Sequence, residues 1–127
     1  MNEMNATLEY TVTEAQTAKT MKSGALAVLA TPALVAMMEE CACKALEGSL
    51  EEGQTSVGTA LSLKHTAATP VGMKVTITAV LTEKEGRRLL FDVVANDEKG
   101  EIGRCTHERF LVMAERFTEK TYQKLEG

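Results

Sequence analysis

The sequence contains no tryptophan, and only three phenylalanines and two tyrosines occur among its 127 residues. A hydrophobic core must therefore be built from Val, Leu, Ala, Met and Thr rather than from large aromatic rings. A chain of this length corresponds to one domain of common size, so we expect a single domain over residues 1–127. A core can form at this size, although it is a modest one.

Long apolar runs and an excess of positive charge are also missing. No stretch approaches the roughly 20 apolar residues that a membrane-crossing helix needs. The first residues, MNEMNATLEY, lack the basic-then-apolar order of a signal peptide. The net charge is −4, whereas nucleic-acid binding normally requires a basic face. We expect a cytoplasmic protein with neither a membrane nor a nucleic acid as its partner.

Cysteine is scarce, and the count is odd. The three residues are Cys41, Cys43 and Cys105. Their number and spacing do not match a zinc site, which usually has four ligands at spacings such as C-x₂-C. We expect packed, reduced thiols, no bound metal and no cofactor.

One helix is predicted clearly, over residues 32–47. Thr31 is a suitable N-cap, Pro32 fits the first helical position, and Gly48 fits the left-handed position after the helix. The helix is apolar nearly all round, which indicates burial on several sides. Its apolar residues are Leu34, Val35, Met37, Met38, Cys41, Ala42, Ala45 and Leu46.

The rest of the chain alternates with the period of β-strands. Residues 6–13 form one candidate strand before the helix. After the helix, regular turns and β-branched residues predict four successive strands, mostly antiparallel. These strands are expected at residues 55–67, 73–85, 87–97 and 101–113.

Three segments have no strong pattern. Residues 14–24 form a polar connection, and residues 25–30 fit either a short helical turn or a buried lead-in. The charged tail from Glu115 is expected to fray. The order of strand, helix and four-stranded meander predicts an α+β protein in which the sheet curls around the helix, which is the hotdog layout.

Two adjacent carboxylates lie in the middle of the apolar helix. Glu39 and Glu40 differ by about 100° around the helix axis, so only one of them can face a packed surface. Burial would raise the pKa of that carboxyl and make it a useful base. The alternative is that both lie on an exposed helix edge, and the pattern alone does not decide. Thr31 precedes Glu39 by about 12 Å of helix, which argues against a direct contact.

The two histidines occupy different contexts. His65 lies at a strand end, before a Pro-Gly turn, where it can open onto a groove and transfer protons near neutral pH. His107 lies inside a strand and is better explained as a satisfied structural histidine. Gly58 interrupts a strand, which suggests close approach of a ligand or another backbone. Arg109 fits a surface salt bridge, or an anchor for a CoA phosphate or an acyl carboxylate.

These segments together resemble the fluoroacetyl-CoA thioesterase family of hotdog proteins. The resemblance covers residues 8–120, and HTAATPVG and GRCTHER are fairly specific in combination. It rests on residues 30–40, 58–60, 65–72, 85–89 and 102–110.

The resemblance implies roles for five residues. In that family a Thr at the helix start, a Glu further along it and a His on the next strand carry the reaction, and a Gly and an Arg line the same pocket. Thr31, Glu39 and His65 are the corresponding catalytic residues here. Gly58 and Arg109 are the corresponding substrate-binding residues. The resemblance implies a structural role for His107.

The sequence differs from this family in the segment that forms the acyl pocket. In the best-known member of the family, bulky aromatic residues before the helix form a lid over the fluoroacyl group. The matching stretch here, GALAVLA, begins with Gly24, Ala25, Leu26 and Ala27. We therefore expect an acyl group that is broader than, or different from, fluoroacetyl.

The sequence-based hypothesis is hydrolysis of a small acyl-CoA to a free acid and CoA. Glu39 would activate water or attack the thioester directly, with His65 and Thr31 assisting. The open edge of one curled sheet predicts a homodimer, which could pair further into a tetramer. The alternatives are a non-catalytic binder of acyl-CoA or a small metabolite, and a dehydratase acting on a hydroxyacyl thioester.

Overall fold

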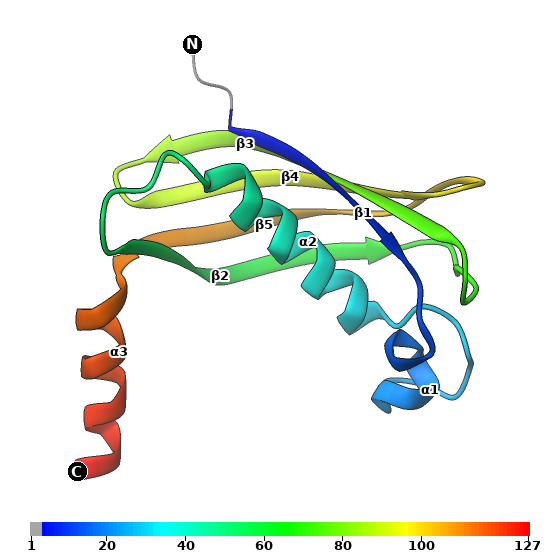
Figure 1. Cartoon of the computed structure of the whole chain (residues 1–127), viewed down its shortest axis with the longest axis horizontal. Helices are drawn as coiled ribbons and strands as arrows, with labels where there is room; N and C mark the ends of the chain where they lie inside the picture. The colour runs from blue at the N-terminus through cyan, green and yellow to red at the C-terminus, as the bar shows by residue number, and fades with distance from the viewer. Residues whose placement is uncertain (1–3) are drawn as a thin grey trace.

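A five-stranded antiparallel sheet curls around one long helix in the computed structural model, which describes residues 4–127 (Figure 1). The predicted α+β hotdog fold is confirmed. The strands are β1 (Asn5–Thr11), β2 (Gln54–His65), β3 (Lys74–Glu85), β4 (Arg88–Asp97) and β5 (Gly100–Met113). Their order in the sheet is β1-β3-β4-β5-β2.

The expectation of a four-stranded meander is wrong in one respect. Only β3, β4 and β5 follow one another as neighbours, and β2 lies at the far edge beside β5. Strand β3 is already flanked by β1 and β4, so residues 66–73 carry the chain across the end of the sheet. As a result, β2 has one open edge whose backbone groups are available for pairing.

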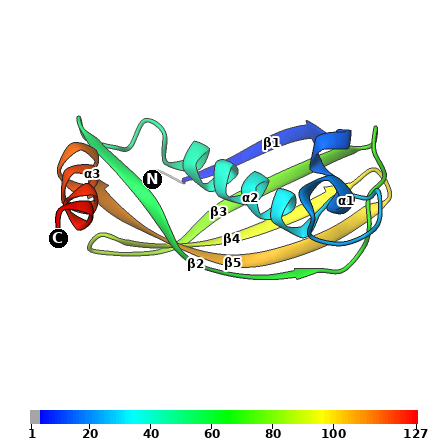
Figure 2. The same cartoon turned by 90° about the horizontal axis from the view of Figure 1, so that it is seen from below.

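Helix α2 (Thr31–Leu46) lies in the concave face of the sheet (Figure 2). Its buried side chains pack on the inward residues of the sheet, among them Phe91 and Ile77. The buried positions of α2 are Ala33, Leu34, Met37, Met38, Cys41, Ala42, Ala45 and Leu46. Gly48 follows the helix with φ of +86°, the left-handed conformation that was predicted.

The start of α2 differs from the prediction by one residue. Ala30 is the N-cap, and its carbonyl accepts the first helical hydrogen bond from Leu34 N at 3.0 Å. Thr31 is already helical, and no side chain caps the helix. The hydroxyl of Thr31 is therefore available for another partner.

The segment before α2 is more ordered than its polar sequence indicates. Residues expected as a connection form a 3-10 turn, η1 (Glu14–Gln16), and a helical turn, α1 (Ala18–Met21). Thr17 supports α1 because its hydroxyl accepts a hydrogen bond from Thr20 N at 3.2 Å. Residues 25–27 are irregular and exposed, whereas Leu29 and Ala30 are buried. A lead-in whose last residues are buried is thus the correct alternative for residues 25–30.

The charged tail also folds, and the expectation of a fraying end is wrong. It forms α3 (Ala114–Tyr122) and a final 3-10 turn, η2 (Gln123–Glu126). Its composition of Ala, Glu, Lys and Arg favours helix, although it buries no residue. Within residues 4–127, no helix is both long and apolar enough to cross a membrane.

All three cysteines are free, as predicted, but the expectation that all are packed is wrong for Cys43. Cys41 and Cys105 are buried and Cys43 is exposed. Burial raises the pKa of Cys41, and burial together with Asp92 raises that of Cys105 to about 11. Both buried thiols are therefore protonated and packed at neutral pH.

Candidate active site

Thr31 and His65 meet where α2 begins and β2 ends. Thr31 Oγ1 lies 2.8 Å from His65 Nδ1, a normal hydrogen-bond distance. His65 Nε2 is buried and has no hydrogen-bond partner within the described part of the chain. Burial lowers the pKa of His65, and the nearby Ala67 backbone offsets this in part. The imidazole is therefore neutral near pH 7, with Nδ1 held by Thr31 and Nε2 available for a further hydrogen bond.

The two adjacent carboxylates of α2 have different partners. Glu40 accepts a hydrogen bond from the Tyr10 hydroxyl, and burial and this carboxylate together raise the pKa of Tyr10. Glu39 instead faces Arg109, with 3.5 Å between Glu39 Oε2 and Arg109 Nη1. The Glu39 side chain keeps 42% of its surface exposed. It is the carboxylate that is both anchored and accessible.

Arg109 is buried beneath Glu39, so of its two alternatives the surface salt bridge is wrong, and its ion pair with Glu39 is made from inside the protein. Its side chain is 7% exposed. Nε donates to Ser56 Oγ at 2.8 Å and Nη2 donates to the Ser56 carbonyl at 3.1 Å. Nη1 lies 3.1 Å from His107 Nε2. These contacts direct the guanidinium at Glu39 from within the protein.

His107 is satisfied, as predicted, and it also fixes Arg109. Its Nδ1 lies 2.9 Å from the Ala60 carbonyl, so this nitrogen must carry the proton and donate it. Nε2 is then the acceptor for Arg109. Burial lowers the pKa of His107, and the Arg109 charge lowers it further. A neutral His107 thus links the backbone of β2 to the arginine.

Because Gly58 has no side chain, the Glu39 carboxylate can lie in the space beside its Cα. A Cβ atom at Gly58 would be 2.7 Å from Glu39 Oε2, 3.2 Å from Arg109 Nη1 and 3.3 Å from His107 Cε1. The β2–β5 register shifts between Gly58 and Ala60. Close approach at this glycine was expected from a ligand or another backbone, whereas the atoms that lie there are side-chain atoms, the Glu39 carboxylate nearest.

The five predicted residues form two groups rather than one. Thr31 and His65 are paired at one place, whereas Glu39, Gly58 and Arg109 are together at another. Within residues 4–127 no hydrogen bond or ion pair joins Glu39 to either member of the first pair. The spacing along α2, about 12 Å, accounts for this separation.

Ser56 and the second role of His107 were not foreseen. Ser56 gave no sequence signal, because a serine in a strand is common. For His107 a signal existed: it alternates with Cys105 and Arg109, and all three inward-facing residues are buried. That alternation assigns His107 and Arg109 to the same face.

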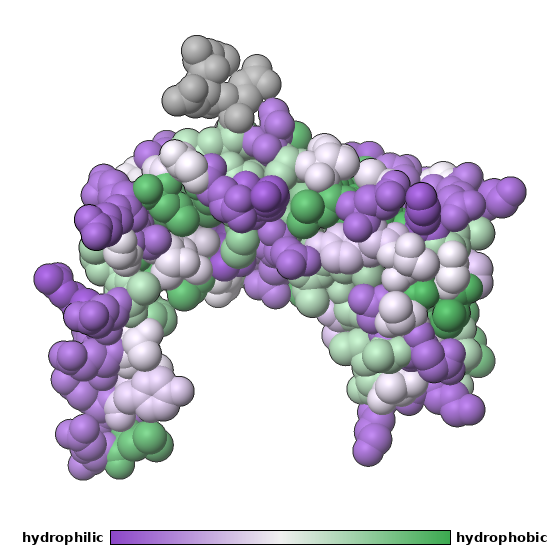
Figure 3. All heavy atoms as spheres, viewed as in Figure 1, coloured by the Kyte–Doolittle hydropathy of each residue, from purple (hydrophilic) through white to green (hydrophobic). Residues whose placement is uncertain are grey.

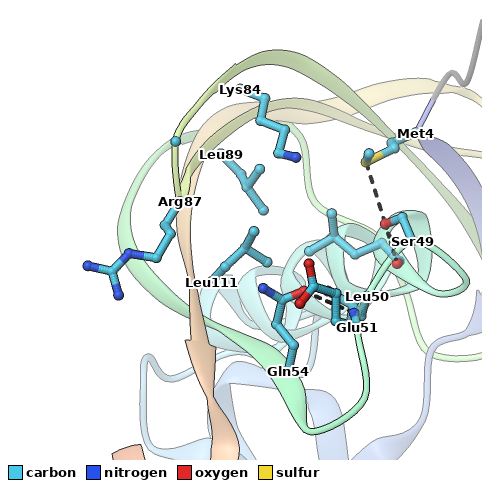
Figure 4. Close-up of a pocket in the computed structure, with 11 residues that line it drawn as sticks. Met4, Ser49, Leu50, Glu51, Gln54, Lys84, Arg87, Leu89 and Leu111 are labelled. Atoms are coloured by element: carbon cyan, nitrogen blue, oxygen red, sulfur yellow. Dashed lines mark hydrogen bonds between the residues drawn. The ribbon is translucent and has the colours of Figure 1, made fainter.

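Two hollows lie at opposite ends of α2. An open groove of about 270 Å³ runs past Thr31 and His65, with small walls that include Ala18, Val28 and Ala67. A second hollow of about 230 Å³ lies between the loop after α2 and the β3–β4 hairpin (Figure 4). None of the five predicted residues lines it. The groove is therefore the hollow that contains predicted chemistry.

Comparison with known proteins assigns the chain to a family. Residues 12–115 match the model of the family described as fluoroacetyl-CoA-specific thioesterase. A fluoroacetyl-CoA thioesterase from Streptantibioticus cattleyicolor is 47% identical over 97 residues, which cover 76% of this chain and 70% of that protein. The chain belongs to the fluoroacetyl-CoA-specific thioesterase family. It is therefore a hydrolase of acyl-CoA thioesters.

Solved structures support the same assignment for this thioesterase. A structure of the fluoroacetyl-CoA thioesterase FlK has a TM-score of 0.92 at 38% identity, with 98% of this chain and 96% of that chain covered. A variant of FlK in complex with fluoroacetate and CoA has a TM-score of 0.86 at 38% identity, covering 92% and 98%. A hot-dog-like protein from Thermanaerovibrio acidaminovorans reaches 0.90 at 25% identity, covering 98% and 93%.

The contacts of Gly58 predict that Gly58→Ala reduces activity more than stability. The new Cβ would displace the Glu39 carboxylate, which is the end of a flexible side chain, and a shift of about 1 Å at a reacting group can cost roughly 100-fold in rate. Gly86→Ala in the β3–β4 hairpin is the control, because its φ of +62° strains an alanine while no atom lies within 4 Å of the new Cβ, so it should lower stability rather than activity. Thiol release and thermal unfolding are measured on both variants. Wild-type activity in Gly58→Ala would contradict the prediction.

The lowered pKa of His65 predicts a loss of stability in mild acid. Below its ordinary value of 6.5, the unfolded chain binds more protons than the folded one, so the free energy of unfolding falls as pH drops. Arg104 holds the pKa of Glu101 below its usual range, and Thr59 and Arg88 do the same for Glu108. These two carboxylates therefore titrate below the histidine window.

Urea unfolding at about pH 7 and about pH 5 measures this dependence. His65→Gln removes one of the two histidines whose pKa is lowered, while His107 titrates in both proteins, so we expect a smaller loss of stability between the two pH values than in the wild type. Equal losses in the two proteins would show that folding does not lower the pKa of His65.

Proposed function

We propose that this thioesterase hydrolyses small acyl-CoA esters with Glu39, His65 and Thr31 as its catalytic residues. The observation that carries the proposal is the position of Glu39. Its carboxylate is half exposed and lies against the space of Gly58, with the buried Arg109 directed at it from below. A carboxylate held in this way is positioned for attack and remains accessible to a substrate.

We infer that each site is shared between two copies of the chain. Because Thr31 and His65 lie apart from Glu39, one copy of the chain does not bring all three catalytic residues together. In a regular antiparallel pair of identical strands, the residue numbers of every facing pair add up to the same total. If β2 pairs with its copy about a centre between Leu61 and Ser62, His65 of one copy lies beside Gly58 of the other, to within the one-residue irregularity between Gly58 and Ala60. Glu39 of one copy then lies near the Thr31–His65 pair of its partner.

The open edge of β2 supports this arrangement. Its outer backbone groups have no strand beside them, and edges of this kind are normally covered or paired. A two-fold pair joins the two sheets into one and produces two identical sites. The active form we propose is a homodimer, and pairing of dimers into a tetramer stays open.

The reaction we propose is cleavage of the thioester C–S bond. Glu39 takes a proton from water as the oxygen attacks the carbonyl carbon, or attacks that carbon itself to give an anhydride that water then opens. The proton that the water gives up is passed through the neutral His65 to the departing CoA sulfur, so the imidazole begins and ends neutral, and Thr31 holds it through Nδ1. Backbone N–H groups at the start of α2 can stabilise the carbonyl oxygen.

The groove supports a broader acyl group than fluoroacetyl. Its walls include Ala18, Val28, Ala67 and Ala68, which leave room beside Thr31 and His65. Free thiols at Cys41 and Cys43 are compatible with the reducing cytoplasm that we propose as the location. The substrate enters as the acyl-CoA, and no separate cofactor is part of the proposal.

A panel of acyl-CoAs, from acetyl to phenylacetyl and including fluoroacetyl, tests the activity. We expect thiol release by the wild type, and a loss of roughly 100-fold or more in Glu39→Gln and His65→Ala because proton transfer is removed. Cys43→Ser, an exposed change on the same helix, is the control and should retain activity. Full activity in Glu39→Gln would remove the central assignment, and thermal stabilisation by CoA esters without any thiol release would indicate a binding protein.

Mixing two inactive variants tests whether the site is shared. In a heterodimer of Glu39→Gln and His65→Ala, one site carries both changes and the other carries neither. Random pairing makes about half of the dimers heterodimers, so about a quarter of wild-type activity should return. The mixture is unfolded, refolded together and assayed beside each variant refolded alone. No recovery, with both variants folded and dimeric, would contradict a shared site.

A further inference from the structure

Helix α3 and the α1 segment project beyond the β2 edge on the same side of the sheet (Figure 1). Between them the space-filling view shows a wide hollow beneath the sheet (Figure 3). Helix α3 buries none of its own residues. The hollow therefore has an open strand edge as its roof and a projection at each end.

Exposed apolar side chains are found on both projections. On α3 and the turn after it, Phe117 is 43%, Tyr122 is 63% and Leu125 is 83% exposed. In and after α1, Met21 is 42% and Leu26 is 67% exposed. Single exposed apolar residues are ordinary, but two groups at the ends of one hollow indicate a covering surface. Charged residues follow the outer side of α3, and paler ones face the hollow (Figure 3).

The anchoring of α3 defines where it would lie in a pair of copies. Ala114 N donates to the Gly53 carbonyl at 2.8 Å, and Met113 pairs with Gln54, so α3 leaves the sheet where β2 begins. This step rests on the pairing of β2 proposed above. In that antiparallel pair, Gln54 at the start of β2 in one copy lies near the end of β2 in the other, where the chain continues past His65.

The partner's groove lies at that position. Ala67 and Ala68 line the groove that contains Thr31 and His65. Val28 and Leu29, in the segment after α1, line it too, and Leu29 N donates to the Thr69 carbonyl at 2.9 Å. A helix that emerges beside this lining and extends about 14 Å can reach across the groove mouth.

We propose that α3 of one copy covers the Thr31–His65 groove of its partner. Tyr122 and Leu125 pack against the partner's projecting segment around Met21 and Leu26, and exclude water from the acyl group. Each site thus takes Thr31 and His65 from one copy, and Glu39 together with the covering helix from the other. Helix α3 is a specificity-determining element of the partner's site, and it holds no reacting atom.

A matched pair of mixtures tests this proposal. The double change Tyr122→Ser and Leu125→Ser is added either to the His65→Ala chain or to the Glu39→Gln chain. Each variant is then mixed with the other inactive chain, which keeps an unchanged α3. The two heterodimers have the same composition and lose the same number of α3 contacts. They differ only in whether the altered α3 belongs to the copy that supplies Glu39 to the intact site.

We expect the restored kcat/KM to fall by roughly tenfold when the altered α3 is on the His65→Ala chain, because that copy supplies Glu39 and the cover. The fall should reside mainly in KM and should be larger for longer acyl groups. The same change on the Glu39→Gln chain should leave the restored activity as it was. Equal losses in both mixtures would mean that α3 only stabilises the dimer. No loss in either mixture would mean that its apolar side contacts a different partner. Either result overturns the proposal.

Failure of this proposal is separable from failure of the proposed function. If the parent mixture of Glu39→Gln and His65→Ala recovers activity, the shared site holds and only the role of α3 is tested. Sedimentation of both α3 mixtures checks that the heterodimers have formed to the same extent. Absence of recovery in the parent mixture overturns the shared site, and the cover inferred from it falls with it.

Discussion

The buried charge of Arg109 is the constraint on which the site depends. A guanidinium inside a protein is tolerated only when its charge is balanced and its N–H groups are bonded. Ser56 and a neutral His107 accept its hydrogen bonds from β2 and β5, and Glu39 supplies the opposite charge from α2. The same balance that stabilises the arginine fixes a half-exposed carboxylate over Gly58. Stability and positioning therefore have one physical cause here.

The sheet order is the basis on which we propose a second copy. Because β2 crosses to the far edge, Gly58 and His65 lie on a strand with one unpaired side. Thr31 and His65 are joined at one end of that strand, and Glu39 is fixed further along it. In the dimer we propose, antiparallel pairing of two such edges brings the end of one strand beside the start of the other, so that each copy completes the other. The projections formed by α1 and α3 border a hollow at this edge, where the proposed partner would lie (Figure 3).

Much of the fold follows from local patterns, and the exceptions have identifiable causes. The apolar run around Met37 and Met38 and the alternation in the later strands predicted the helix and all five strands. The start at Thr31 was misplaced by one residue, because its hydroxyl bonds to His65 rather than capping the helix, a contact with no local signal. The position of β2 depends on contacts between distant strands. Strong helix formers outweighed the polar character of the tail. The burial of Arg109 required partners on two strands, which spacing along the chain does not reveal.

The crystal structure of the protein with a non-hydrolysable acyl-CoA analogue tests the central claim most directly. The account predicts two copies joined along β2, with the carbonyl carbon between Thr31 and His65 of one copy and Glu39 of the other. It also predicts that the Glu39 carboxylate keeps its contact with Arg109 when the analogue is bound. An analogue bound wholly within one copy, or copies joined at another surface, would contradict it.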